Sequence, residues 1–407
     1  MKIIKNYRSS IILLISMAIG AFLGITVDGI ATYAEPVADT FINLLFCLVV
    51  PLILFSTVNA ISRMSDMKKL GKMLGIMFIL FVIAGFIAAV FMSATVTIFN
   101  PAQGVTMEFN EVVDTTGASS NFLAMFTVND FYLLFSRRSL MPLVVFALMI
   151  GIAMSSLGKD VDILSQGVDA LEKIVMKLIG YVMKLAPLGI GSSFAVLMSS
   201  YGSEIAGPLS RSIVIYMGAA VIFYFGFHSV FAYVGGGIEG IRRLWKTALT
   251  PALTALGTCS SAASIPSNTI AYNQSGISEE VTSLMVPLGT NFHKDGAVMI
   301  QILKIAFMCS IYGINFLEPS VLMNAIFTSI TASIVMGAIP AGGYVGELFI
   351  VAAFGFPAES IPIMVLIGTI TDAPATAIHV TGDVAVAMIV EKIMNGKDWI
   401  KKQIKMS

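Results

Sequence analysis

The sequence predicts an all-α protein that crosses a membrane many times, and two observations support this prediction. Of the 407 residues, 57% are hydrophobic and only 12% are charged, whereas a soluble domain carries about 25% charged residues. The hydrophobic residues also form long runs, most of which approach the ~20 residues that a helix needs to span a bilayer. The chain therefore lacks the polar surface of a water-soluble fold, and we interpret it as a polytopic membrane protein.

The clearest spanning segments lie in the first two thirds of the chain. They cover residues 11–27, 41–61, 74–99, 140–154 and 213–234. The run at 140–154 is short, and we expect its flanks to extend it. The first run follows Lys2, Lys5 and Arg8, as in a signal peptide, but no small-residue cleavage site precedes a soluble domain. The sequence therefore predicts that this first helix is retained.

Basic residues gather in alternate loops and orient the helices. Lysine and arginine are favoured in cytoplasmic loops, so their distribution predicts a multi-pass protein of the cell membrane with both termini in the cytoplasm. The residues that carry this prediction are Lys2, Lys5, Arg8, Arg63, Lys68, Lys69, Lys72, Lys159, Arg242, Arg243, Lys246, Lys392, Lys397, Lys401, Lys402 and Lys405. Arg137 and Arg138 lie on the opposite side, near the polar outer loop over residues 101–130, and are the exception.

The charge balance and the cysteines argue against other classes. The chain has 24 basic and 24 acidic residues, and a balanced charge disfavours nucleic acid as a partner. Its three cysteines, Cys47, Cys259 and Cys309, stand in apolar surroundings. They predict free thiols and not a disulfide framework. We expect no cofactor and no bound metal, because no metal-ligand spacing occurs.

Two segments in the second half interrupt the helical pattern. Residues 258–269 are small and polar with a proline, and residues 333–344 contain a second proline followed by glycines. Irregular backbone at membrane depth persists only where protein or a water-filled cavity satisfies its polar groups. Two such segments predict re-entrant hairpins around a site near the membrane midplane. A proline kink and a loop in an ordinary helix bundle are the alternative.

A third unusual segment, residues 287–296, places charged side chains in an otherwise apolar stretch. His293, Lys294 and Asp295 follow one another there. An isolated charge at bilayer depth is costly, so such residues usually line a polar site.

At these segments the sequence resembles the dicarboxylate/amino acid:cation symporter family, which includes the glutamate transporters. Residues 260–266 resemble the serine-rich tip of the first hairpin, 287–296 the unwound seventh helix, and 338–343 the second hairpin tip. Residues 379–383, His-Val-Thr-Gly-Asp, resemble the Asn-Val-Thr-Gly-Asp of the eighth helix, which is the most specific match. Residues 99–101 and 183–187 agree more weakly. The resemblance runs in order through nearly the whole chain.

The resemblance implies a fold of eight transmembrane helices plus two re-entrant helical hairpins, assembled as a homotrimer. A scaffold would contain residues 1–70 (helices one and two) and 101–208 (the outer loop and helices four and five). A transport domain would contain residues 71–100 (helix three) and 209–407 (helix six, hairpin one, helix seven, hairpin two and helix eight). In this glutamate-transporter-like fold the transport domain moves through the membrane like an elevator.

Departures from the family pattern fall on its sodium sites. His293 and His379 stand where the family has Asn, and Lys294 where it has Met. Threonine and serine of the family are replaced by Ala84, Gly85 and Ala297. Sodium is a hard cation that needs oxygen ligands, so the resemblance implies that its sites are lost. The residues expected to couple transport to an ion are His293, Lys294, Asp295, His379 and Asp383. Lys294 is either a fixed counterion of Asp295 or a titrating group, whereas His228 is expected to be structural.

The expected substrate is a neutral amino acid. Asp372 matches the family aspartate that pairs with the substrate amine, but the two places where acidic-substrate members keep an arginine hold Ala375 and Cys259. Without a guanidinium, a second substrate carboxylate is poorly matched. The substrate-binding residues implied by the resemblance are Ser260, Ser261, Gly342, Asp372, Ala375, Thr376 and His379.

These observations predict a secondary active transporter of neutral amino acids that is sodium-independent and either proton-coupled or exchanging. A sodium-coupled symporter of acidic amino acids or C4-dicarboxylates is the alternative, with Asp383 and backbone carbonyls holding one sodium. An anion-conducting channel is an alternative of another class. An enzyme that uses His293, Asp295 and His379 is disfavoured, because no nucleophile motif accompanies them.

Overall fold

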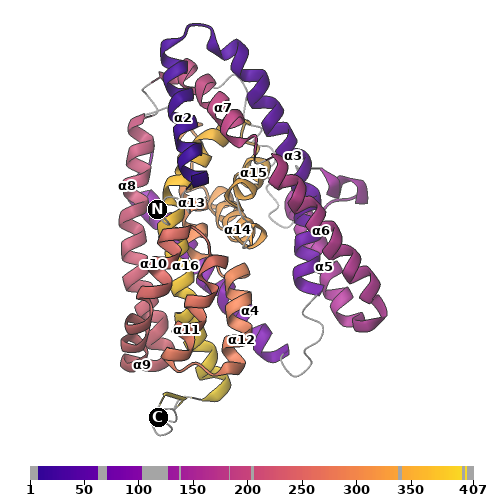
Figure 1. The fold of residues 1–407 in the computed structure, drawn as a ribbon, viewed down its shortest axis with the longest axis vertical. Coiled ribbons are helices and arrows are strands. Elements are labelled where there is room, and N and C mark those ends of the chain that lie inside the picture. The colour runs from indigo at the N-terminus through magenta and orange to yellow at the C-terminus, as the bar shows by residue number, and fades with distance from the viewer. Residues whose placement is uncertain are drawn as a thin grey trace.

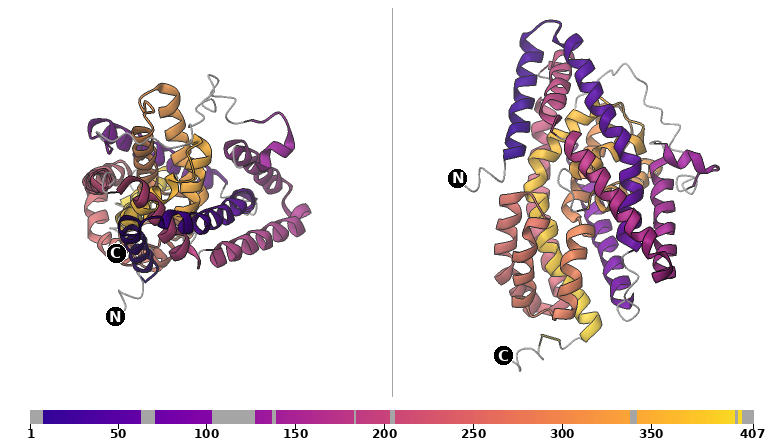
Figure 2. Two further views of the ribbon diagram at one scale, coloured as in Figure 1. Left: turned by 90° about the horizontal axis from the view of Figure 1, so that it is seen from above. Right: turned by 45° about the vertical axis from the view of Figure 1, so that its right-hand side comes forward.

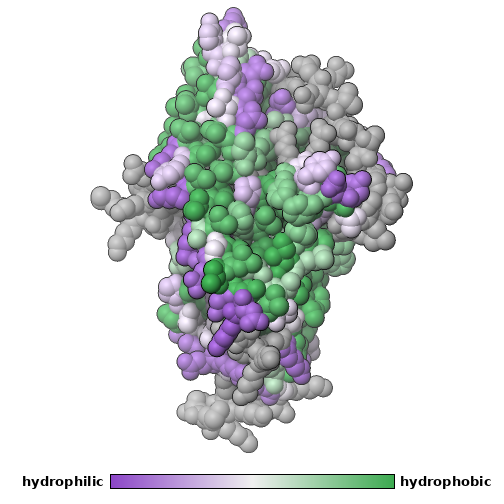
Figure 3. All heavy atoms as spheres, turned by 90° about the vertical axis from the view of Figure 1, so that its right-hand side faces the viewer, coloured by the Kyte–Doolittle hydropathy of each residue, from purple (hydrophilic) through white to green (hydrophobic). Residues whose placement is uncertain are grey.

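The computed structural model of the chain describes residues 8–62, 71–102, 127–136, 139–182, 184–202, 206–337, 342–396 and 399–400. All regular secondary structure within these residues is helical (Figure 1). Six helical stretches of this described part are long and apolar enough to cross a membrane. A broad hydrophobic area covers the middle of the face shown in Figure 3. The predicted all-helical, multi-pass membrane architecture is thus confirmed, and Cys47 and Cys309 are free thiols, as expected.

The first group of helices lies before and after the polar outer loop. It consists of α2 (Arg8–Thr26), α3 (Ile30–Ser62), η4 (Phe131–Phe135), α5 (Leu140–Leu157), η6 (Gly158–Val161), α6 (Asp162–Val182) and α7 (Ala186–Tyr201). Within it α2 packs along α7, and α3 packs against α5, α6 and α7. Small residues let α2 and α7 approach closely: a Cβ on Gly20 would lie 2.0 Å from the carbonyl oxygen of Gly191.

The helix α4 (Gly71–Ile98) belongs to a second group, although it follows α3 in the chain. It packs against α12, α13, α14 and α16. The remaining helices of this group come from the C-terminal half: α8 (Ala206–Ile222), η8 (Phe223–Phe227), α9 (His228–Thr247), α10 (Leu249–Thr258), η9 (Ala262–Ser264), α11 (Ile265–Ser275), α12 (Glu279–Phe292), α13 (Asp295–Ile311), α14 (Pro319–Met336), α15 (Gly342–Phe354) and α16 (Ser360–Asn395).

The chain reverses direction inside α9, at Gly237. This residue has φ +64, a backbone conformation that glycine adopts without steric cost. Beyond it the chain runs back along the first half of α9. A hydrogen bond between the two halves shows this: the Trp245 indole nitrogen donates to the Ser229 hydroxyl at 2.9 Å. The second half of α9 and α10 therefore form one arm of a hairpin.

The predicted interruption near Pro266 is present. The helix α10 ends at Cys259, which has φ +49, and a short 3-10 turn over Ala262–Ser264 leads into α11. Pro266 lies in the first turn of α11, where its missing N–H leaves no hydrogen bond unmade. The second predicted break falls between α14 and α15, and its residues 338–341 lie outside the described residues.

The helix α16 organises the second group. It runs through the length of the bundle, in yellow in Figures 1 and 2, and packs against α8, α9, α10, α12, α13 and α15. The apolar side chains around it form two large clusters and a small third one that contains Ala377 and Val380. One large cluster contains Val298 of α13 and Ile378 of α16, and the other contains Met285 of α12 and Val384 of α16. Along α16, the buried polar residues His379, Thr381 and Asp383 fall between Ile378 and Val384.

Candidate substrate and ion site

The centre of the candidate site is the gap between α12 and α13. The backbone leaves the helical conformation at His293 (φ −88, ψ 107) and Lys294 (φ −136, ψ 42). Asp295 then occupies the first turn of α13, where the partial positive charge of a helix N-terminus favours a carboxylate. The interruption predicted in the seventh helix is therefore present, and it places three polar side chains in the middle of the bundle.

The side chain of His293 bridges two carboxylates. Its Nδ1 lies 2.9 Å from Asp383 Oδ1, and its Nε2 lies 3.1 Å from Asp295 Oδ2. The three side chains are at most 1% exposed. The contact with Asp383 is a hydrogen bond, whereas the contact with Asp295 is within ion-pair distance but lacks hydrogen-bond geometry within the described residues. A carboxylate only accepts, so Nδ1 must carry a hydrogen to bond Asp383, and a second hydrogen on Nε2 would make the ring a cation. The arrangement suits a positive charge held between Asp295 and Asp383.

Close packing fixes this triad. The Phe81 ring of α4 lies 5.3 Å from the His293 ring, centroid to centroid. A Cβ on Gly289 would lie 2.7 Å from Asp383 Oδ1, and one on Gly382 would lie 2.9 Å from His293 Cε1. Both positions therefore require glycine for the triad to form.

A second polar chain starts at Lys294. Its Nζ donates to the Ser261 hydroxyl oxygen at 2.9 Å, and this oxygen lies 2.9 Å from His379 Nε2. Lysine only donates, so the Ser261 hydroxyl hydrogen is free to bond His379 when Nε2 carries no hydrogen. These contacts join three elements: the break between α12 and α13, the turn that follows α10, and the helix α16. Lys294 thus directs its amine to Ser261, while His293 makes the ion-pair contact with Asp295.

The other predicted substrate residues come from α16, the tip after α10 and the start of α15. Asp372 of α16 is exposed, unlike Ala375 and Thr376 on the same helix, which are buried. The Ser260 hydroxyl accepts a hydrogen bond from the Ala263 backbone N–H at 3.2 Å and so stabilises the tip itself. Gly342 is the first residue of α15. An exposed carboxylate such as that of Asp372 is suited to bind an amine.

Sequence reasoning missed a third histidine in the centre. His228 is fully buried. A Cβ on Gly382 would lie 3.0 Å from His228 Nε2 and 2.9 Å from His293 Cε1, so both rings pack against Gly382. Neither of its ring nitrogens has a hydrogen-bond partner within the described residues. It follows directly after the π-helical turn Phe223–Phe227, and such turns are frequent at functional sites. A π-turn has no sequence pattern that would have revealed this placement.

A buried ion pair between Lys304 and Glu347 was also missed. Each is a single charge in a long apolar stretch, and that pattern alone marks a functional candidate in a membrane protein. Among the described residues, no group of three or more His, Cys, Asp or Glu side chains is placed to hold a metal ion.

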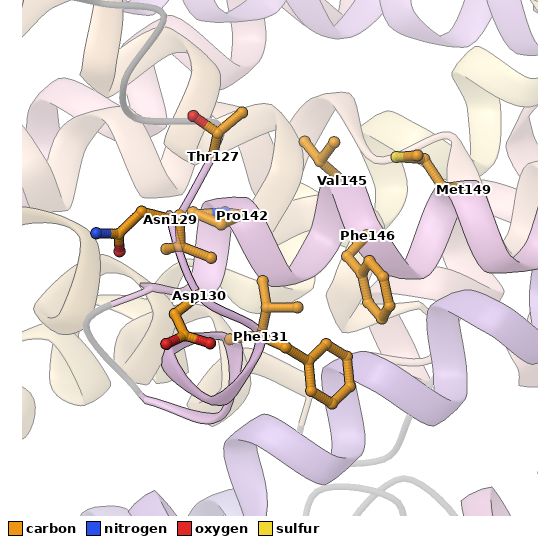
Figure 4. Close-up of a pocket in the computed structure, with 10 residues that line it drawn as sticks. Thr127, Asn129, Asp130, Phe131, Pro142, Val145, Phe146 and Met149 are labelled. Atoms are coloured by element: carbon orange, nitrogen blue, oxygen red, sulfur yellow. The ribbon is translucent and has the colours of Figure 1, made fainter.

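A surface pocket elsewhere on the molecule does not belong to this site. It has a volume of about 240 Å³ and is lined by residues of η4 and α5 and the chain before them, including Val128, Phe131 and Phe146 (Figure 4). None of the predicted site residues lines it.

Residues 10–393 match the sodium:dicarboxylate symporter family. The chain is 28% identical over 398 residues to a proton/sodium-glutamate symport protein of Geobacillus stearothermophilus, with 92% of each chain covered. It is 23% identical to a C4-dicarboxylate transport protein of Bacillus subtilis, covering 98% of this chain and 96% of the relative. It is 24% identical to a proton/glutamate-aspartate symporter of Escherichia coli, covering 95% and 94%.

Proposed function

The chain belongs to the sodium:dicarboxylate symporter family and is a secondary transporter of that family, and we propose that it carries neutral amino acids across the cell membrane without sodium. The observation that carries this proposal is the His293 side chain between Asp295 and Asp383. It supplies, from within the chain, a positive charge between two carboxylates that would otherwise attract a cation.

The donor set around the triad disfavours sodium. A sodium ion needs several oxygen ligands, but the nearest oxygens of Asp295 and Asp383 face imidazole nitrogens. The neighbouring positions Ala84 and Gly85 offer no side-chain oxygen. Protons are the remaining coupling ion that His293, Lys294 and His379 could exchange, and plain exchange of amino acids needs no ion at all.

The preference for a neutral substrate rests on the missing arginines. Asp372 offers an exposed carboxylate for the substrate amine. Ser261, Thr376 and His379 offer polar groups for the rest of the amino acid backbone. Ala375 and Cys259 offer no guanidinium for a second carboxylate. The competing function is sodium-coupled transport of acidic amino acids or C4-dicarboxylates, which the names of the relatives favour.

We further propose that the two helix groups act as scaffold and transport domain. The group α2, α3 and α5–α7 would be the scaffold of a homotrimer, with both termini in the cytoplasm. The group α4 and α8–α16 would form the moving unit with two re-entrant hairpins. The packing supports this division, because α4 contacts the C-terminal helices and α2 contacts mainly α7.

Uptake into liposomes tests the proposal. Purified protein is reconstituted, and sodium and pH gradients are imposed separately at fixed membrane potential. We expect uptake of a neutral amino acid that sodium does not change and that exceeds uptake of aspartate and succinate. Stimulation by an inward proton gradient would assign proton coupling, and exchange without any gradient effect would assign antiport. Uptake that rises steeply with sodium, or tight binding of aspartate, would contradict the proposal.

A further inference from the structure

The buried pair Lys304–Glu347 joins two helices of the second group. Lys304 lies on α13 and Glu347 on α15, and their side chains are 1% and 2% exposed. One oxygen of Glu347 accepts from the Lys304 ammonium, whereas the other, Oε2, has no hydrogen-bond partner among the described residues. The lysine charge is thus satisfied by a single carboxylate of the protein itself.

The pair lies directly against α16, beside the candidate substrate position. A Cβ on Gly368 would be 2.8 Å from Lys304 Nζ and 2.9 Å from Glu347 Oε1. Gly368 precedes Asp372 by four residues, or about 6 Å along the helix axis. The Asp372 carboxylate interacts electrostatically with both Lys304 and Glu347. Because residues 368–370 and 372 are partly or largely exposed, the pair lies just behind the surface that a substrate held at Asp372 would face.

A buried ammonium demands an anionic partner. A substrate with an acidic side chain would bring a carboxylate to this part of the site and would be a suitable partner for Lys304. Glu347 already provides that carboxylate. Because it is attached to the chain, its effective concentration near Lys304 is higher than that of a carboxylate on a free substrate.

From this geometry we infer that Glu347 is an internal substitute for the side-chain carboxylate of an acidic substrate. It occupies Lys304 and thereby restricts the carrier to neutral amino acids. The inference rests on the proposed function. It adds that Glu347 excludes acidic substrates, because it occupies the Lys304 ammonium that would otherwise bind their side-chain carboxylate.

Exchange of Glu347 for glutamine tests the inference, because the size of the side chain is kept and its charge is removed. Binding of aspartate, succinate and alanine is measured for the unmodified protein, Glu347→Gln, and the double variant Glu347→Gln/Lys304→Met. We expect Glu347→Gln to bind aspartate or succinate at least tenfold more tightly than the unmodified protein does. The double variant should lose that gain, because it lacks the ammonium.

A gain that persists in the double variant, or no gain in Glu347→Gln, would overturn the inference while leaving the proposed function intact. If the unmodified protein itself binds aspartate more tightly than alanine, the proposed function fails first. Should Glu347→Gln be too unstable for binding assays, acetate provides a second readout. Acetate should raise its unfolding temperature and leave that of the double variant unchanged; equal responses would contradict the inference.

Discussion

At the scale of single residues, the centre of the molecule is organised by His293. Its two nitrogens face carboxylates from two different helices, Asp295 on α13 and Asp383 on α16. Asn268 adds a weaker contact to Asp383, 3.4 Å from its Nδ2 to Oδ2. A buried pair that loses one partner is destabilised by about 3–5 kcal/mol, so the imidazole holds these helices together as well as balancing their charge.

The variant His293→Asn should expose the sodium preference that the imidazole suppresses. Asparagine supplies an amide oxygen and leaves Asp295 and Asp383 without a cation. We expect a lower unfolding temperature in sodium-free buffer, loss of most sodium-independent uptake, and a rise in unfolding temperature on adding sodium. Potassium at equal concentration is the control for ionic strength. An unmodified protein that sodium stabilises equally well would contradict this expectation.

The variant Asp372→Asn should weaken substrate binding without unfolding the protein. Asp372 is exposed, and loss of a charge-assisted bond to the substrate amine costs about 1.5–3 kcal/mol, or roughly 10- to 100-fold in affinity. The matched control is Glu359→Gln, which makes the same chemical change at the exposed residue before α16. Isothermal titration with a neutral amino acid measures both, and an unchanged affinity for Asp372→Asn would remove Asp372 from the site.

Most of the polar residues of the candidate site could be identified from the sequence, because charged side chains are rare in apolar helices. Charges such as Lys294 and Asp383 stand out in apolar helices, and the family resemblance assigned them to one centre. The pairing was not accessible, because partners lie on helices 90 residues apart, as for His293 and Asp383. His228 was interpreted as structural for the same reason: only the folded backbone brings it next to Gly382.

At the scale of helices, the interruptions are what create the site. Small hydroxyl residues and a proline marked the break near Pro266 in the sequence, whereas the break at His293 was expected from its charged residues and from the family resemblance. The reversal at Gly237 was not predicted, although Gly235, Gly236 and Gly237 follow one another there and consecutive glycines mark turns. The break between α12 and α13 frees the side chains of two consecutive residues to point to different partners, Asp383 for His293 and Ser261 for Lys294.

Glycines at the helix crossings are a testable requirement of this arrangement. In Gly382→Ala the new Cβ would lie 2.9 Å from His293 Cε1 and 3.0 Å from His228 Nε2. Overpacking of this kind destabilises by about 1–3 kcal/mol. Gly218→Ala is the control, since no atom lies within 4 Å of its Cβ, and alanine at this exposed helical position should be neutral or stabilising by up to about 1 kcal/mol. Unfolding temperatures in lipid nanodiscs compare the two, and equal values would argue against the tight contact.

At the scale of the whole molecule, the helices separate into two groups that contact one another much less than they contact themselves. The sequence indicated the helices from their apolar runs, whereas the assignment of α4 to the C-terminal group came from the family resemblance. Apolar side chains of α6 remain open on the outer surface of its group, with Ile163 88% and Ile174 55% exposed. They are available for lipid or for a second copy of the chain.

Three copies are the expected assembly. Native mass spectrometry of protein released from detergent or nanodiscs should give a mass three times that of the 43.4 kDa chain. A predominant monomer or dimer, at concentrations where the protein remains active in liposomes, would contradict the trimer.

The covalent attachment of His293 also limits what the carrier can accumulate. A bound sodium ion leaves on the far side of the membrane and transfers the energy of its gradient to the substrate, whereas an imidazolium travels back with the protein. Under the proposed function, a His293 that keeps its proton would contribute no driving force, and the transporter would bring the pools of its substrate toward equality. Uphill accumulation then requires a proton released elsewhere in the centre. One elementary charge crossing 100 mV provides about 2.3 kcal/mol, enough for a concentration ratio of roughly fifty.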